Sequence, residues 1–186
     1  MSLKKIDPNQ LELVKYPDPR LRTKCAEVKE FDDWLRQVAE RMFEIMYASK
    51  GIGLAAPQVG LGIRIFVCNP AGKPSSPEGM VFVNPVLTDL AGAAESEEGC
   101  LSFPGVYGQV MRAAKCRIRA YDVNGNPLDR QGEDMLARIW QHEVDHLEGV
   151  LHIDRFGEAA KLACRRTLRE MEEAYKGKGR KKSLVP

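Results

Sequence analysis

The feature that most constrains this chain is the pentapeptide 142–146, which follows the pattern HExxH. Successive residues of an α-helix advance by about 100° around its axis, so His142, Glu143 and His146 fall within one arc of about 100°. Two imidazoles suit a borderline cation such as zinc or ferrous iron, and the carboxylate can act on water at the cation without being a ligand. The pentapeptide therefore predicts a helix that carries part of a metal site, and a polar patch without a metal is the alternative.

A complete metal site needs a third protein ligand, and the sequence offers two candidates. His152 extends the pattern to HExxHxxGxxH, which is typical of metzincin metallopeptidases. Those enzymes also need a methionine turn below the metal, and the only methionine downstream, Met171, lies in a segment that is predicted to be helical. The other candidate is Cys100, whose thiolate with two imidazoles would leave a fourth tetrahedral position open for water.

Three segments of the chain, taken together, resemble the signature motifs of peptide deformylase. They are GIGLAAPQVG at 51–60, EEGCLSFPG at 97–105 and the HExxH pentapeptide, in that order. The resemblance extends from the segment KYPDP at 15–19 to the segment LEG at 147–149. Three motifs in order are far more specific than one HExxH pattern.

The resemblance implies a role for each residue that matches a motif. Cys100, His142 and His146 would be the metal ligands, and Glu143 would be the general acid/base. Gln58 and the backbone N–H of Leu101 would form the oxyanion site. Other positions implied to bind substrate are Gly51, Ile52, Gly53, Glu98, Gly99, Ile139 and His142. The family usually has a bulky apolar residue where His152 stands, so we expect His152 to be a core or helix-end residue.

The activity implied by the resemblance is metal-dependent hydrolysis of the N-formyl group of the formyl-methionine of newly synthesised polypeptides. Water activated by the cation would attack the formyl carbon, and Glu143 would pass a proton to the departing amine. The cofactor would be one divalent metal ion, ferrous iron in the cell, although a Cys/His/His site also accepts zinc, nickel or cobalt. Arg138 and Ser96 stand where some family members have aliphatic residues, which would make the mouth of the methionine pocket more polar. The alternative, which we favour, is that Arg138 lies with its stem on apolar surface and its charged head in water.

The residue patterns predict an α+β fold, in which antiparallel β layers pack around a central HExxH helix. An N-terminal helix is expected from the apolar spacing over 31–46, with Asp32 or Asp33 as its cap and Gly51 as its stop. A C-terminal amphipathic helix is expected over 158–175. Strands are expected at 63–68, 80–83, 86–89 and 116–122, with a hairpin turn at 124–125 and a short return strand near Leu128.

The glycines at 51 and 53 do not predict a nucleotide site, because they follow a helix and the chain has no GxGxxG motif or Walker lysine. Small residues instead allow an extended peptide to pair with Ile52 and Gly53 by strand addition. A helix stop and a tight turn are the alternative explanation for these glycines.

The composition is typical of a single enzyme domain. A chain of 186 residues with 44% hydrophobic residues can bury one core, so we expect one catalytic domain over 1–186 with a basic tail from about residue 176. The first residues contain no signal segment and no stretch is long and apolar enough to span a membrane, which predicts a cytoplasmic protein. An organelle form without its transit peptide would fit the same sequence. Five cysteines without framework spacing indicate a reducing compartment.

The segment 175–182 contains five basic residues and two glycines, which predicts a solubilising tail. In bacterial deformylases with a terminal helix that helix is associated with ribosome docking, and a basic tail could add contacts with rRNA. The resemblance therefore also suggests the ribosome as a partner. The non-enzyme alternative is a ribosome-binding module with a degenerate site, and the intact motif residues argue against it.

Overall fold

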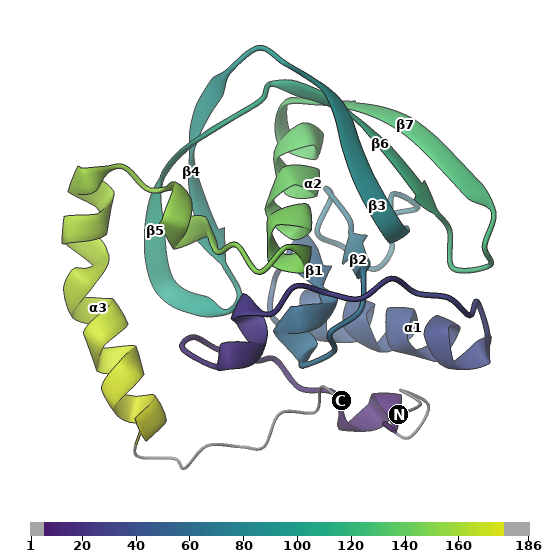
Figure 1. Cartoon of the computed structure of the whole chain (residues 1–186), viewed down its shortest axis with the longest axis horizontal. Helices are drawn as coiled ribbons and strands as arrows, with labels where there is room; N and C mark the ends of the chain where they lie inside the picture. Colours follow the sequence, from purple (N-terminus) through teal and green to yellow (C-terminus); the bar gives the residue numbers. More distant parts are fainter. Residues whose placement is uncertain (1–5, 177–186) are drawn as a thin grey trace.

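Two antiparallel sheets flank a central helix. In the computed structural model, which describes residues 6–176, helix α2 (Asp134–Leu147) stands between a five-stranded and a two-stranded sheet (Figure 1). The larger sheet has the order β1-β2-β3-β6-β7, and the smaller pairs β4 with β5. The strands are β1 (Gly53–Ala55), β2 (Ile65–Cys68), β3 (Met80–Ala91), β4 (Ala94–Cys100), β5 (Phe103–Arg112), β6 (Lys115–Tyr121) and β7 (Pro127–Glu133). The expected α+β arrangement around the HExxH helix is confirmed.

Helix α2 buries an apolar face against the larger sheet. Trp140 packs edge-on against Phe82 of β3, with 5.4 Å between the ring centroids. Ala137, Ile139 and Leu147 belong to the same buried cluster as residues of β2 and β6. Burial of a large apolar side chain stabilises a fold by roughly 1.5–3 kcal/mol, so this face fixes how the helix is rotated about its axis. The histidines of the helix are thereby turned away from the larger sheet and toward β4.

The other two helices cover the outside of the sheets. Helix α1 (Asp33–Ala48) packs against β1 and β2, and α3 (Glu158–Lys176) packs against β5 (Figure 1). Of the two candidate caps, Asp32 is the one used, because its carboxylate accepts a hydrogen bond from the N–H of Leu35 at 3.1 Å. The predicted helix over 158–175 is confirmed, with one further residue at its end.

The expectation that Gly51 stops α1 was wrong in detail. The helix ends at Ala48, and the residue with a left-handed backbone is Lys50, with φ of 58°. Its N–H donates to the carbonyl oxygen of Tyr47 at 2.9 Å. Gly51 is needed for another reason, since a Cβ there would lie 2.6 Å from Cδ1 of Leu101.

Two of the expected strands are parts of one. The segments 80–83 and 86–89 both lie in β3, whose pairing with β6 shifts register between Val83 and Val86. Asn84 lies at the shift with φ of 51°, and its side chain exchanges two hydrogen bonds of 2.8 Å with the backbone of Val28. The shift explains why the apolar pattern stops at 83 and resumes at 86. The turn at 124–125 is confirmed, and its return strand β7 is longer than expected.

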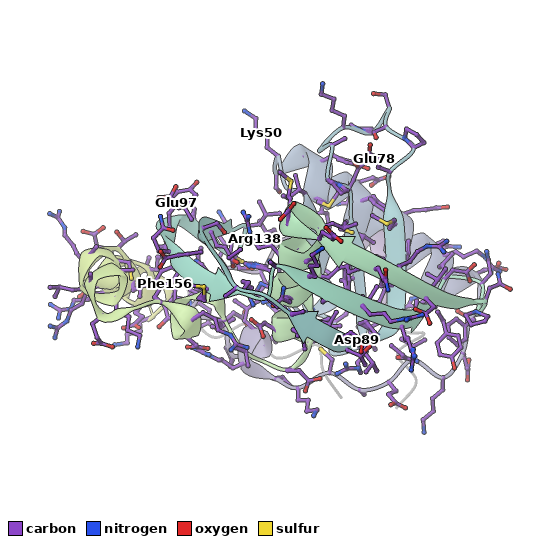
Figure 2. The ribbon with its side chains drawn as sticks, turned by 90° about the horizontal axis from the view of Figure 1, so that it is seen from above. Lys50, Glu78, Asp89, Glu97, Arg138 and Phe156 are labelled. Carbon is purple, nitrogen blue, oxygen red and sulfur yellow. The ribbon has the colours of Figure 1, made fainter. Side chains whose placement is uncertain are left out.

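The sheet of β4 and β5 was not predicted from the sequence. β4 is mostly acidic and small residues, and the buried positions of β5 include Gly108 and Arg112 beside Val106 and Val110. A glycine and an arginine at buried positions hide the apolar alternation that marks a strand. Gly108 is required because a Cβ there would lie 2.7 Å from the ring of Phe156, which lies beside β5 (Figure 2).

Three expectations concern membrane spans, the basic tail and the number of domains. Within the described residues, no helix combines the length and the apolar character that crossing a membrane requires. The predicted basic tail lies almost entirely outside the described residues, and the assignment of one domain over 1–186 stays a prediction.

Candidate active site

Three side chains that can hold a metal ion converge between the smaller sheet and α2. Cys100 ends β4, and His142 and His146 lie one helical turn apart on α2. One potential ligand atom from each lies within 4.8 Å of the others, and no other such group occurs within residues 6–176. Sγ of Cys100 is 3.3 Å from Nε2 of His146. A thiolate and two imidazoles are a donor set that fits a borderline divalent cation, so the residues present fit a metal.

His152 lies outside this group. Its ring packs edge-on against Phe103 and Phe156, with centroid distances of 4.8 and 5.0 Å, and its Nε2 is 3.4 Å from the carbonyl oxygen of Val106. Burial lowers the pKa of His152 to about 4, which keeps the ring neutral. The geometry therefore favours Cys100 over His152 as the third ligand, and the position of His152 agrees with the expected core residue.

A buried carboxylate orients His142. Oε2 of Glu98 is 3.0 Å from Nδ1 of His142, which leaves Nε2 of that ring to bind a cation. Arg112 donates two hydrogen bonds to Glu98, at 2.8 and 2.9 Å, and a third to Asp145 at 2.6 Å. Burial alone would raise the pKa of Glu98, but the bonds from Arg112 and His142 lower it to about 2. Glu98 is thus a fixed anion behind the imidazole.

Glu143 faces the same space without a charged partner. It is 4% exposed, its Oε2 has no hydrogen-bond partner within the described residues, and burial raises its pKa to about 7. Gly53 of β1 lies directly against it, since a Cβ at that position would overlap the carboxylate. The absence of a side chain at 53 therefore leaves room for the carboxylate that a general acid/base requires.

Gln58 is held in one orientation by the backbone of Ala55. Its Oε1 accepts a hydrogen bond from the N–H of Ala55 at 2.8 Å, so its Nε2 points the other way, 3.3 Å from Sγ of Cys100. The same Nε2 lies 3.3 Å from Oγ of Ser102, a fully buried residue that the sequence reasoning missed. An amide N–H fixed beside the metal ligands can donate to an anionic oxygen.

Two of the three potential metal ligands, Cys100 and His142, line a cavity of about 810 Å³, whereas His146 does not. All of the positions expected to contact substrate line it, and so do Cys100, Gln58, Leu101 and Glu143. Arg138 also lines the cavity, whereas Ser96 does not, so Ser96 has no part in the polarity of its mouth. Figure 2 labels Arg138 on α2, together with Lys50 and Glu97 from neighbouring segments of the lining. Lys15, Lys50, Glu97, Tyr107 and Met135 are lining residues to which the resemblance assigned no role.

The sequence family described as Polypeptide deformylase matches residues 10–161. The chain belongs to this family. It is 43% identical over 166 residues to a chloroplastic peptide deformylase 1B of rice, and 42% identical over 162 residues to a peptide deformylase of Acidobacterium capsulatum. The family expected from the three motifs is confirmed.

Solved structures of the polypeptide deformylase family have the same fold. A plant peptide deformylase structure is 41% identical, covers 94% of this chain and 96% of its own, and has a TM-score of 0.89. Crystals of the Plasmodium falciparum peptide deformylase give 42% identity, 89% and 98% coverage, and a TM-score of 0.87. The chain spans 62% of the length of the rice and Arabidopsis relatives, but 95% of the Acidobacterium relative.

Proposed function

We propose that this chain is a peptide deformylase, which hydrolyses the N-formyl group of formyl-methionyl peptides and releases formate and a free amino terminus. The observation that carries the proposal is that Cys100, His142 and His146 form one potential ligand group, and that the first two of them line a single cavity together with Glu143 and Gln58, in a chain of this family. The HExxH motif alone would not carry the proposal, since this motif occurs in other hydrolases.

The metal would be held by Cys100, His142 and His146. A divalent cation bound there would supply a Lewis acid that polarises the formyl carbonyl and makes water more acidic. We propose ferrous iron as the ion in the cell, with zinc, nickel or cobalt as ions that the same donors accept. Glu98 supports the site by accepting a hydrogen bond from Nδ1 of His142, which leaves the other ring nitrogen for the cation.

Glu143 would be the group that moves the proton. It lies beside Gly53 at the wall of the cavity, with one carboxylate oxygen free of protein partners. From this position it can accept a proton from the attacking water and return it to the nitrogen of the departing amine. The products are then formate and the amine of methionine.

Gln58 and the backbone N–H of Leu101 would stabilise the charge that develops on the formyl oxygen. The amide of Gln58 is already oriented by Ala55, so it needs no rearrangement when charge develops. Preorganised donors of this kind are worth roughly 3 kcal/mol of transition-state stabilisation each.

The peptide would bind along β1 and β4. Ile52 and Gly53 would offer backbone groups for strand addition, with Gly51 beside them in the lining, and Ile52 is 39% exposed. Glu98, Gly99, Ile139 and His142 would complete the pocket for the methionine side chain. Ile139 and the carbon atoms of His142 supply its apolar surface.

Two further assignments concern the setting of the enzyme. We propose the ribosome as a partner, supported by Arg165, Arg166 and Arg169, which are exposed on α3 next to the basic tail. Cosedimentation of the protein with ribosomes, compared with a variant that has these three arginines changed to Ser, would test it.

We also propose that the protein acts in the cytoplasm, or in an organelle that begins translation with formyl-methionine.

The activity is tested by formate release from formyl-Met-Ala-Ser and from acetyl-Met-Ala-Ser. We expect turnover of the formyl peptide only. The carbonyl carbon of a formyl group bears a hydrogen where that of an acetyl group bears a methyl group, and the end of the cavity beside Cys100 would accommodate only the hydrogen. Equal turnover of both peptides would reject a deformylase site. No release of formate by the metal-loaded protein would reject the proposed activity itself.

A further inference from the structure

The rim of the cavity contains three cationic side chains that have no ion-pair partner among the described residues. Lys15, Lys50 and Arg138 line the cavity, and none of them forms an ion pair or a side-chain hydrogen bond with another described residue. Of the lining carboxylates, Glu98 is neutralised by Arg112, and Glu143 lies deep in the site. Within residues 6–176, Glu97 is thus the one exposed carboxylate of the lining, and the rim has an excess of positive charge.

The backbone of Lys50 adds a second observation. Its φ of 58° lies in the left-handed region, at a helix end where glycine is the usual residue. A side chain with a Cβ is unfavourable in this conformation, so the lysine is not explained by the needs of the backbone. Lys50 is exposed and projects outward from the end of α1 (Figure 2). The fold therefore presents a cation at the rim in a position where glycine would be less strained.

A bound formyl-peptide would bring its later residues to this rim. The formyl group would have to reach Cys100 and Glu143, and the methionine side chain would occupy the apolar pocket. The chain that follows the methionine would then leave through the opening, where its second and third residues would pass Lys15 and Lys50, which are exposed, and Arg138, which is half-buried.

We propose that Lys15, Lys50 and Arg138 make this enzyme select formyl-methionyl peptides whose second and third residues are acidic over peptides with basic residues there. The inference rests on the proposed function and names the substrate class within it. A single pair of exposed charges contributes little to binding. Here three cations would attract an acidic peptide and repel a basic one, so both effects enlarge the difference between the two peptides. We expect a preference of about tenfold at low salt.

The preference should be expressed in binding and not in the chemical step. The rim does not contact the formyl carbon, so its charges act equally on the bound substrate and the transition state, which changes KM and leaves kcat unaltered. Because exposed charges are screened by salt, the preference should decrease toward unity at about 1 M NaCl, where the Debye length is about 3 Å.

The experiment compares kcat/KM for formyl-Met-Asp-Asp and formyl-Met-Lys-Lys, each with an amidated carboxyl terminus, with formyl-Met-Ala-Ala as the neutral reference. A higher value for the acidic peptide, caused by KM and reduced by salt, is the expected result. Equal values, with formate released from the neutral reference, would overturn the charge selection alone. Absence of formate from all three peptides would instead reject the proposed function, and the selection with it.

Two variants and a control assign the effect to the rim. Lys50→Gly removes a cation and keeps the left-handed backbone accessible, so the acidic-to-basic ratio should decrease about two- to threefold. Glu97→Gln should increase the ratio by a similar factor. Lys29→Gln removes an equal charge from an exposed residue that does not line the cavity, and should leave the ratio unchanged. A ratio that responds to Lys29→Gln as strongly as to Lys50→Gly would mean that net charge, and not the rim, is responsible.

Discussion

The inner end of the cavity and its rim contain the same kinds of charged residue, arranged in opposite ways. At the inner end, Glu98 and Arg112 are both 4% exposed in their side chains and neutralise each other through two hydrogen bonds. At the rim, Lys50 and Arg138 have no partner in the described part of the chain. A charge with fixed partners can hold an imidazole in one orientation, whereas a charge without partners is available to a ligand.

The largest effect is expected at the metal ligands of the inner end, where Cys100 supplies the one thiolate. Cys100→Ala should lose tight metal binding and all activity, because two imidazoles alone hold a cation weakly. His152→Phe should keep both, since its ring packs among aromatic residues outside the ligand group. Metal content by elemental analysis, with circular dichroism as the check of folding, measures this. A folded His152→Phe protein without metal would restore the metzincin alternative.

The next largest effect is expected at Glu143, and it tests whether this residue is a metal ligand or a group that acts on water. Glu143→Ala should retain the metal and lose turnover by at least about 10³-fold, because the carboxylate transfers a proton and is not in the ligand group. Single-turnover formate release and metal analysis on the same sample measure the two properties. Loss of the metal in this variant would make Glu143 a ligand and would contradict its assignment.

A smaller effect is expected at Gln58. Gln58→Ala should reduce kcat by a factor of 10² to 10³, or about 3 kcal/mol, if its amide donates to the developing oxyanion. The metal content should remain normal, because the amide only lies beside Sγ of Cys100. Gln58→Glu is the informative companion, since it keeps the size of the side chain and replaces the N–H donor by an acceptor. A decrease of less than about threefold in the Ala variant would exclude Gln58 from the oxyanion site.

The inner end could be predicted from the sequence because its chemistry depends on residue types at fixed spacing. His142, Glu143 and His146 are brought together by one helical turn, and their order in the chain is enough to place them. Cys100 could be assigned only through the family resemblance, since the approach of β4 to α2 is a tertiary contact between residues 42 apart in sequence or more. The sequence left Cys100 and His152 as alternatives, and the packing of His152 between two aromatic rings distinguishes them.

The rim and the smaller sheet could not be predicted for a related reason. Nothing in the sequence distinguishes Lys15 or Lys50 from any solvated lysine. Lys50 reaches the cavity because α1 ends beside it, and Lys15 because the N-terminal segment passes along it. Ser102 was missed because its partner Gln58 is far away in the chain. Local patterns report helical and strand periods, but they do not report which surface residues a fold gathers around one opening.

The smallest expected effect is on protein stability and not on activity. It compares Lys50 at the rim with Gly51 in the packed wall of the site. Lys50→Gly should leave the free energy of unfolding unchanged within about 1 kcal/mol, because relief of the left-handed backbone offsets the extra chain entropy of glycine. Gly51→Ala, one residue further, should destabilise the protein by roughly 1–3 kcal/mol, since the added Cβ would lie 2.6 Å from Leu101 in the packed wall of the site. Urea denaturation of both variants under identical conditions measures the difference. If Lys50→Gly were the more destabilising change, the lysine would be a structural part of the helix end, and its presence at the rim would no longer need a role in substrate selection.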